Sequence, residues 1–181
     1  MKKTPLKAKQ GLKATKSLQA KPKQRKKPTK LSDKTAQQLV GVVDKPFSRY
    51  IRLRDSERVD DRWVGKCITC NKTGLVAWID ENDNIRFVKG WDAGHFISRG
   101  VHQLRFDEEN VNLQCSFHCN KMKSGNLEKY KPALDFKYGD GTWEKLSKLA
   151  QQDGSHKLFT KAEYLQMNED SKQQIKWYLG E

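Results

Sequence analysis

Long apolar runs are missing from this sequence of 181 residues. No stretch approaches the roughly 20 apolar residues that cross a bilayer, and the basic start at Met1 is not followed by the apolar core of a signal peptide. These absences predict a cytoplasmic protein with no membrane partner. Cysteine is also scarce, with four residues in all. In a reducing compartment, close pairs of cysteines are more often metal ligands than disulfides.

Acidic residues are absent from residues 1–30, which hold 11 Lys and one Arg. The whole chain has a formal net charge of +14, from 36 Lys and Arg against 22 Asp and Glu, so 24 basic residues face 22 acidic ones in the remainder. Residues 1–35 also contain too few large apolar groups to offset the entropy of ordering. We therefore predict a disordered basic arm over 1–35, whose lysines, Lys26 and Lys27 among them, bind nucleic acid by charge. A tail that only improves solubility is the alternative.

Capping residues and apolar spacing indicate both helices and strands. Asp44 as a cap and Pro46 in the first turn predict a helix from about 46 to 55. Two β-prone runs around a polar turn predict a hairpin of residues 75–80 and 85–88. Three more helices are expected: a short one leading from Cys115 to about Lys123, one over 142–150, and one after the capping box at Thr160 to Glu163. The fold class is therefore α+β.

The length fits one domain plus a tail, because domains commonly hold about 100–200 residues. We expect residues 36–136 to form the core together with its leading helix. Residues 137–181 would then form a C-terminal helical extension. No internal repeat divides the chain further.

Two cysteine pairs predict a zinc site. Cys67 and Cys70 have the C-x2-C spacing of a zinc knuckle, and 44 residues separate them from Cys115 and Cys119, which have three residues between them. Thiolates suit Zn²⁺, which completes structural sites with four tetrahedral ligands. His118 lies in the other permitted register, so a Cys₃His site is an alternative. Four protein ligands leave no open position, and we expect this zinc to be structural.

Side chains suited to phosphodiester chemistry surround the two cysteine pairs. Hydrolysis needs a base that activates water, a hard cation and donors that hold the phosphate. His95 offers the base, while Asp92 and Asn120 offer oxygen ligands. Arg99 or Lys123 offers the phosphate contact. Because Asn120 directly follows a predicted zinc ligand, the zinc site would hold a catalytic-metal ligand through the backbone.

The motifs together resemble the phage lambda NinG (Rap) proteins, within the wider HNH (ββα-metal) nuclease group. The resemblance covers about residues 45–135. It is carried by the sequences YIRLRD at 50–55, CITC at 67–70, WDAGHF at 91–96, LRFDE at 104–108, NVNLQC at 110–115, CN at 119–120 and KSGN at 123–126. It implies a small zinc-stapled HNH-like core and an endonuclease that cuts branched recombination intermediates such as Holliday junctions and D-loops. Such a protein would act on the nucleoid of a bacterial host.

The resemblance also implies roles for individual residues. His95 matches the first histidine of the HNH pattern and would be the general base. Either Asn110 or Asn112 matches the middle asparagine, which orients that histidine or holds its loop. Asn120 takes the last position as a ligand of Mg²⁺ or Mn²⁺. Gly94 departs from the pattern, because many relatives place a metal ligand there, and Asp92 is the expected substitute.

Lys121 and Lys123 follow the last motif and are expected to contact phosphate. Symmetric cutting of a junction requires two active sites, which makes a homodimer possible. Two alternatives stay open at this point. One is a non-catalytic zinc-dependent module that binds nucleic acid, and the other is an HNH nicking enzyme with a different DNA substrate.

Overall fold

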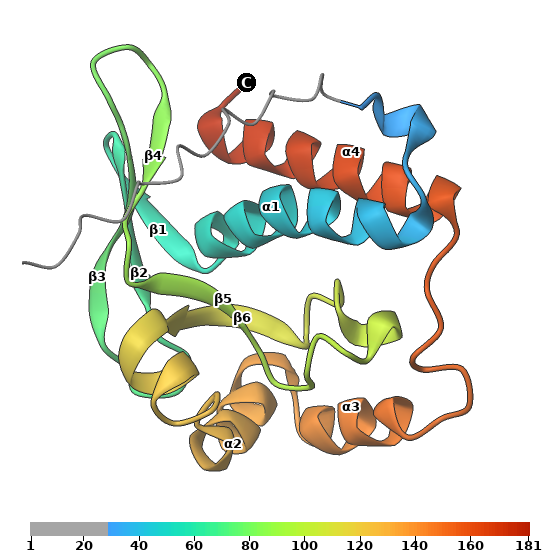
Figure 1. The fold of residues 1–181 in the computed structure, drawn as a ribbon. Coiled ribbons are helices and arrows are strands. Elements are labelled where there is room, and N and C mark those ends of the chain that lie inside the picture. Colours follow the sequence, from blue (N-terminus) through green and yellow to red (C-terminus); the bar gives the residue numbers. More distant parts are fainter. Residues whose placement is uncertain (1–28) are drawn as a thin grey trace, which may run out of the picture.

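The computed structural model of the chain describes residues 29–181. It contains helices and two antiparallel sheets, which confirms the predicted α+β class. Figure 1 shows the elements in three tiers, with α4 beside α1, the β5–β6 hairpin beneath α1, and α2 and α3 below the hairpin. The longer helices are α1 (Ala36–Arg54), α2 (Leu127–Tyr138), α3 (Thr142–Ala150) and α4 (Lys161–Leu179). None of the described helices is long and apolar enough to cross a membrane.

The first sheet has four strands in the order β1-β2-β3-β4. Its last two strands confirm the predicted hairpin, with Asp80 accepting hydrogen bonds from the backbone N–H groups of Asn82 and Asn84 in the turn. The preceding hairpin was not predicted from the sequence. The strands are β1 (Ser56–Val59), β2 (Arg62–Lys66), β3 (Thr73–Ile79) and β4 (Ile85–Phe87).

The second sheet pairs β5 (Trp91–His95) with β6 (Val111–Cys115), and a wide turn of π-helix, η3 (Ser116–Lys121), follows directly. A short 3-10 turn, η2 (His102–Leu104), lies in the loop between the two strands. The sequence indicated no strand here, because Gly94 interrupts the β-prone pattern. The register places Gly94 opposite Asn112, and a Cβ on Gly94 would lie 2.4 Å from Gln114 Oε1. The hairpin therefore needs glycine at this position.

Helix α1 begins ten residues before the predicted start at 46, so that prediction is wrong at its N-terminus. Thr35 and Gln38 form a capping box that satisfies the first turn. Pro46 consequently lies inside the helix, on a partly buried side. The apolar face of α1 extends back to Leu39 and packs against α4, which provides the tertiary contacts that stabilise the early turns.

Arg54 and Asp55, at the end of α1, bind the free edge of β6. The Asp55 carboxylate accepts a 2.8 Å hydrogen bond from the backbone N–H of Leu113, and the Arg54 guanidinium donates at 2.9 Å to the carbonyl of Val111. These two side chains satisfy backbone groups that a neighbouring strand would otherwise pair with. The end of α1 thus holds β6, and through it β5, in place.

The C-terminal helices agree with the sequence analysis in their bounds. Helix α3 spans the predicted residues 142–150, and the capping box at Thr160 and Glu163 begins α4. Helix α2 runs across the expected boundary at 136/137, and α4 packs on α1. At the other end, Leu31–Asp33 of the expected basic arm form a 3-10 turn, with Leu31 packed against the α1–α4 core.

Candidate active site and metal centre

The four cysteines come together as the sequence predicted. Their sulfur atoms all lie within 4.8 Å of one another, and Cys70 Sγ lies 3.7 Å from Cys115 Sγ. A tetrahedron with Zn–S bonds of about 2.3 Å would place its sulfurs about 3.8 Å apart, so the cluster fits Zn²⁺. His118 is exposed and lies outside the cluster, which leaves Cys119 as the fourth ligand.

The helix turn η3 explains how three residues fit between the second pair of cysteines. Met122 donates its backbone N–H to the carbonyl of Phe117 at 2.9 Å, a hydrogen bond across five residues. This wider turn takes up the additional residue and brings Cys119 back toward Cys115. On the other side, Cys67 and Cys70 lie in a tight turn closed by backbone hydrogen bonds, including 2.8 Å from Cys67 N–H to the Lys72 carbonyl.

Hydrogen bonds prepare Cys67 to act as a thiolate. Burial alone would raise its pKa, but the Thr69 hydroxyl and the backbone N–H groups of Cys115, Thr69 and Cys70 lower the pKa to about 7. The Cys115 N–H lies 3.3 Å from the Cys67 sulfur. Thiolates are the form that binds zinc, so these bonds favour the metal-bound state.

A polar pocket of about 360 Å³ lies beside the hairpin. Side chains from α1, β5, the loop after β5 and η3 line this pocket. Asp92, His95, Arg99 and Asn120, four of the residues selected from the sequence, line it. Ser48 of α1 also lines this pocket and was missed, because no spacing in the sequence links α1 to the hairpin.

Asp92 and Asn120 contact each other within the pocket. The Asn120 amide nitrogen donates a 2.8 Å hydrogen bond to Asp92 Oδ2. This bond leaves Asn120 Oδ1 and Asp92 Oδ1 without a partner among the described residues. Each of these two neighbouring side chains therefore keeps one hard oxygen atom available, of the kind that Mg²⁺ or Mn²⁺ accepts as a ligand.

The orientation of His95 is set by its backbone surroundings. Nε2 lies 2.9 Å from the carbonyl of Arg105, and because a carbonyl only accepts, Nε2 must carry the proton. Nδ1, which makes no hydrogen bond within the described residues, is then left with its lone pair. Burial lowers the pKa of His95 to about 4, and the charges of Arg99 and Arg105 act in the same direction. The imidazole is therefore a neutral base at pH 7.

Asn110 and Asn112 are both fully buried, but they have different partners. Asn110 binds the loop after His95: its side chain accepts from the Ile97 N–H at 2.6 Å and donates to the carbonyls of Ile97 and Leu104. Asn112 faces away from the pocket and accepts from Lys137 at 2.6 Å and from Tyr138 at 2.7 Å. Of the two candidates for the middle HNH position, Asn110 is the one that holds the loop.

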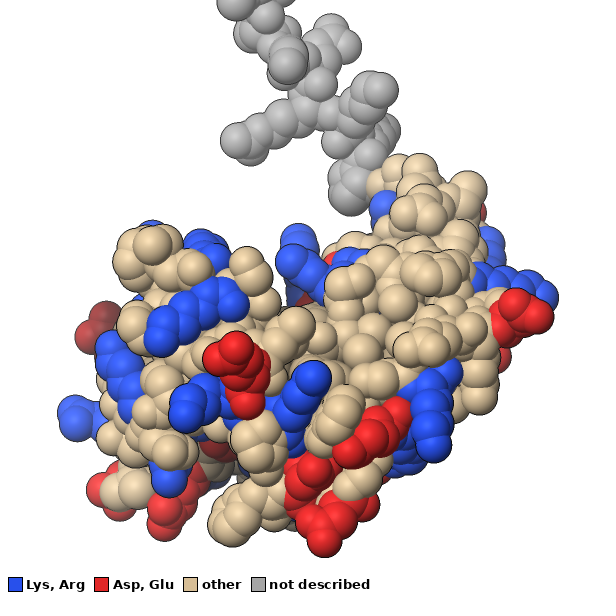
Figure 2. All heavy atoms as spheres, turned by 90° about the horizontal axis from the view of Figure 1, so that it is seen from below, with Lys and Arg blue, Asp and Glu red and all other residues tan. Residues whose placement is uncertain are grey.

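The proposed phosphate contacts differ in their positions. Arg99 lies at the pocket, whereas Lys121 at the end of η3 and Lys123 in the following turn are exposed and do not line it. Lys26 and Lys27 lie outside the described residues. Figure 2 shows the molecule from below, the side of α2 and α3 in Figure 1, with Lys and Arg spread across this face among Asp and Glu.

Comparison with known proteins identifies the family. A family model described as Bacteriophage Lambda NinG protein matches residues 1–179, nearly the whole chain. The chain belongs to the NinG family. This confirms the family part of the resemblance that the motifs indicated.

Individual NinG proteins match over shorter segments. Protein ninG of Salmonella phage P22 is 51% identical over 45 residues, which are 24% of this chain and 22% of the relative. Protein ninG of Escherichia phage lambda is 46% identical over 50 residues, or 27% of this chain and 24% of the relative. The aligned part thus spans about a quarter of the length of these NinG relatives. No solved structure matches the chain.

Proposed function

We propose that this NinG protein is a divalent-metal-dependent endonuclease that hydrolyses phosphodiester bonds in branched DNA. The observation that carries the proposal is the pocket in which His95, Asp92 and Asn120 meet. Two antiparallel strands followed by a helical turn place these residues, and this order of elements supports an HNH-type (ββα-metal) site. A site that only bound zinc would not need a neutral histidine in the same pocket as Asp92 and Asn120.

His95 acts as the general base in this proposal. Its unprotonated Nδ1 takes a proton from a water molecule as that water attacks phosphorus. The Arg105 carbonyl keeps the imidazole in the required tautomer through the 2.9 Å bond to Nε2. Asn110 fixes the loop from which that carbonyl comes, so the base is held by the backbone of its own loop.

Asp92 and Asn120 would hold Mg²⁺ or Mn²⁺ through their free oxygen atoms. When bound, the ion supplies charge stabilisation for the phosphate and for the departing O3′. Two protein ligands are typical for Mg²⁺, which keeps several water molecules and binds substrate phosphate directly. Arg99 contributes a guanidinium at the same pocket for a phosphate oxygen. Lys121 and Lys123 extend the positive charge along the exposed turn.

The substrate part of the proposal rests on the NinG resemblance and on charge. Cutting two strands of a junction symmetrically would require two copies of the pocket, so we expect a homodimer on such DNA. The site of action would be the DNA of the bacterial host cell. A basic arm at residues 1–30 would add affinity without sequence preference.

Cleavage of a synthetic four-way junction, compared with linear duplex of the same sequence, tests the proposal. We expect wild-type protein to cut the junction only when Mg²⁺ or Mn²⁺ is added, and His95→Ala to bind it equally well without cutting. His118→Ala is the matched control, because that imidazole is exposed and outside both sites.

Equal cleavage by wild type and His95→Ala would remove the histidine from the mechanism. Binding without cleavage under any metal would instead favour the non-catalytic zinc module. Cleavage of duplex and junction at the same rate would favour a nicking enzyme with a different substrate.

A further inference from the structure

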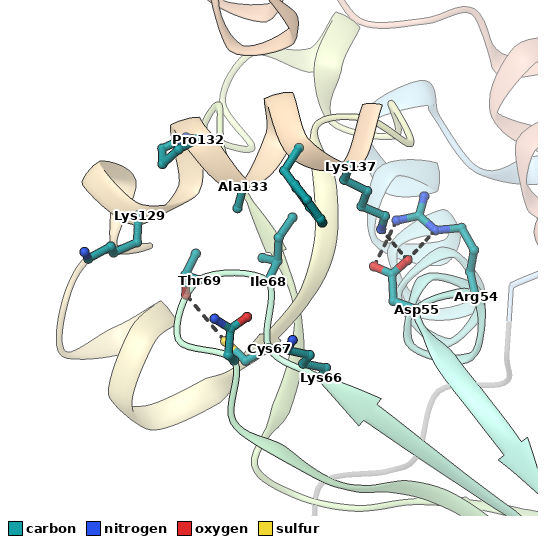
Figure 3. Close-up of a pocket in the computed structure, with 12 residues that line it drawn as sticks. Arg54, Asp55, Lys66, Cys67, Ile68, Thr69, Lys129, Pro132, Ala133 and Lys137 are labelled. Atoms are coloured by element: carbon teal, nitrogen blue, oxygen red, sulfur yellow. Dashed lines mark hydrogen bonds and ion pairs between the residues drawn. The ribbon is translucent and has the colours of Figure 1, made fainter. Parts of the chain in front are cut away.

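A groove of about 670 Å³ lies between α2 and the turn that carries Cys67 and Cys70. It shares no lining residue with the His95 pocket. In Figure 3, Ala133 and Lys137 project from α2 above Ile68 and Thr69 of the cysteine turn. The volume falls within the range of about 300–1,000 Å³ that is typical of sites for small ligands.

One face of α2 lines the groove and is only partly covered, with Lys137 bonded to Asp55 and Asn112 at its end. The opposite face is covered, since Tyr130 and Leu134 are fully buried in the core with α3. The groove face follows the spacing i, i+3, i+4, i+7, i+8 that normally packs on another element, with residues 129, 132, 133, 136 and 137. Phe136 is 95% exposed on this face. A large aromatic ring is therefore presented to solvent over an apolar groove.

The rim of the groove is positively charged. Its ionisable lining comprises four basic side chains, the carboxylate of Asp55 and the thiol of Cys67, which belongs to the cysteine cluster. Figure 3 places Lys129 at one end and the Arg54–Asp55–Lys137 cluster at the other. This charge disfavours the Lys-rich residues 1–30 as an occupant and favours a polyanion with an apolar portion. Nucleic acid combines both properties.

A side chain able to contact a base edge lies beside the apolar surface. Asn71 lines the groove, is exposed, and its amide makes no hydrogen bond within the described residues. The amide carries both donors and an acceptor. Its backbone has a positive φ of 58° and is held by a 3.0 Å hydrogen bond from the Asn71 N–H to the Cys67 carbonyl. The backbone of the turn that carries Cys67 and Cys70 therefore fixes the position from which the Asn71 amide lines the same groove as Phe136.

We propose that this groove binds an unpaired nucleobase of the DNA substrate, stacked on Phe136 and flanked by phosphates at Lys66 and Lys129. Stacking on an aromatic side chain accepts any base, because every base has a π face. The inference deepens the proposed function, since a branch differs from duplex in offering bases that are free to leave the stack. The turn that carries Cys67 and Cys70 would then contribute both to substrate recognition and to the stability of the active site.

Equilibrium binding to a fluorescent single-stranded oligonucleotide and to the matching duplex, with Zn²⁺ bound and no Mg²⁺, tests the groove apart from cleavage. We expect Phe136→Ala to weaken single-strand binding by roughly 5- to 150-fold, the range of one lost base stack, and to change duplex binding less than two-fold. Phe136 is almost fully exposed, so the variant should fold. Trp177→Ala is the matched control, an exposed aromatic residue on α4, away from the groove.

A fluorescent adenine analogue, 2-aminopurine, placed in the single strand provides a second measurement. Its emission should be quenched by wild type and by Trp177→Ala, and not by Phe136→Ala. Unchanged single-strand affinity in Phe136→Ala, or equal loss on single strand and duplex, would overturn the groove proposal. If wild type never cleaves yet shows the Phe136-dependent quenching, the nuclease proposal fails and the groove stands. If wild type cleaves the junction but Phe136→Ala binds and quenches as wild type does, the groove proposal fails and the nuclease proposal stands.

Discussion

The carboxylate of Asp44 on α1 binds the guanidinium of Arg105 through two hydrogen bonds, of 2.9 and 2.6 Å. The backbone carbonyl of that same arginine accepts the proton of His95 Nε2. Asp44 lies 61 residues before Arg105 in the sequence. It holds the arginine whose carbonyl sets the tautomer of His95, the proposed general base. Both side chains of the pair are largely buried, at 28% and 15% exposed, which favours a stable geometry.

Replacing Asp44 by Asn should slow cleavage without touching the reacting groups. The neutral amide holds Arg105 less firmly, and the carbonyl that orients His95 gains freedom. We expect the rate constant of cleavage to fall by about 10- to 100-fold while KM for the junction stays within about two-fold. Single-turnover kinetics separate the two quantities. Asp61→Asn, a carboxylate that is 75% exposed, is the control and should match wild type.

The low pKa of His95 predicts how cleavage depends on pH. An imidazole with the ordinary pKa of about 6.5 would lose its base form below that pH, but His95 stays neutral down to about pH 4. We therefore expect the single-turnover rate to persist as the pH is lowered from 7 to 5. An inflection of the wild-type rate near pH 6.5 would contradict the buried, neutral histidine.

The same shift predicts a contribution to the pH dependence of stability. Between about pH 4 and 6.5 the unfolded state binds a proton at His95 that the folded state does not, so this contribution is fully present above 6.5 and is lost as the pH falls toward 4. Urea unfolding at several pH values should show a shallower loss of unfolding free energy in His95→Ala than in wild type. His118→Ala should keep the wild-type slope.

The two buried asparagines should differ in their effect on activity. Removing either amide leaves buried partners unsatisfied, so we expect Asn110→Ala and Asn112→Ala each to lower the free energy of unfolding by about 3 kcal/mol. Only Asn110 binds the loop after His95, and only its variant should lose cleavage at a temperature where both proteins are folded. Urea denaturation and the junction assay measure the two effects. Loss of cleavage in Asn112→Ala alone would reverse the assignment of the middle HNH position.

Zinc should be present at one ion per chain and should be required for the fold around β6 and η3. The four sulfurs hold two separate segments together, and structural zinc sites contribute on the order of 10 kcal/mol to folding. We expect Cys119→Ser to lose zinc and to melt at a markedly lower temperature. His118→Ala should retain the full stoichiometry in elemental analysis, and loss of zinc in that variant would restore the Cys₃His alternative.

Deleting residues 1–28 should weaken binding to every DNA by a similar factor. Residues 1–28 carry 11 Lys and Arg, and each phosphate contact that is lost reduces the slope of log K against log salt by about 0.9. Deletion further, into residues 31–35, would also remove the Leu31 contact and the Thr35 cap of α1. An unchanged salt slope on titration from low to high salt would show that the basic segment does not contact DNA.

The cysteine cluster could be predicted from sequence because few chemistries use two close cysteine pairs. Asp92, His95 and Asn120 were selected because of their chemistry and the family pattern, and the structure brings them to one pocket. The choice between Cys119 and His118 was not settled by spacing. It depends on the width of the η3 turn, which is decided by the packing of that turn against β5 and β6.

Other parts of the site depend on contacts between distant segments. The roles of Ser48 and Asp44 require α1 to lie over the hairpin, and α1 itself begins earlier than its proline suggested, because packing against α4 stabilises the first turns. Arg105 orients His95 through its backbone carbonyl. Because every residue has a backbone carbonyl, no sequence motif could have predicted this contact. The groove beside α2 was likewise hidden, since its two walls lie about 60 residues apart in the chain.

Asn120 follows Cys119 directly, so one peptide bond joins a residue of the cysteine cluster to the residue that would bind the second ion. Inhibition by a strong chelator would therefore have two possible causes, since removal of either proposed metal would stop the proposed reaction. Restoring activity with magnesium alone would identify a reversible catalytic loss, whereas a requirement for zinc together with refolding would reveal that the scaffold had collapsed.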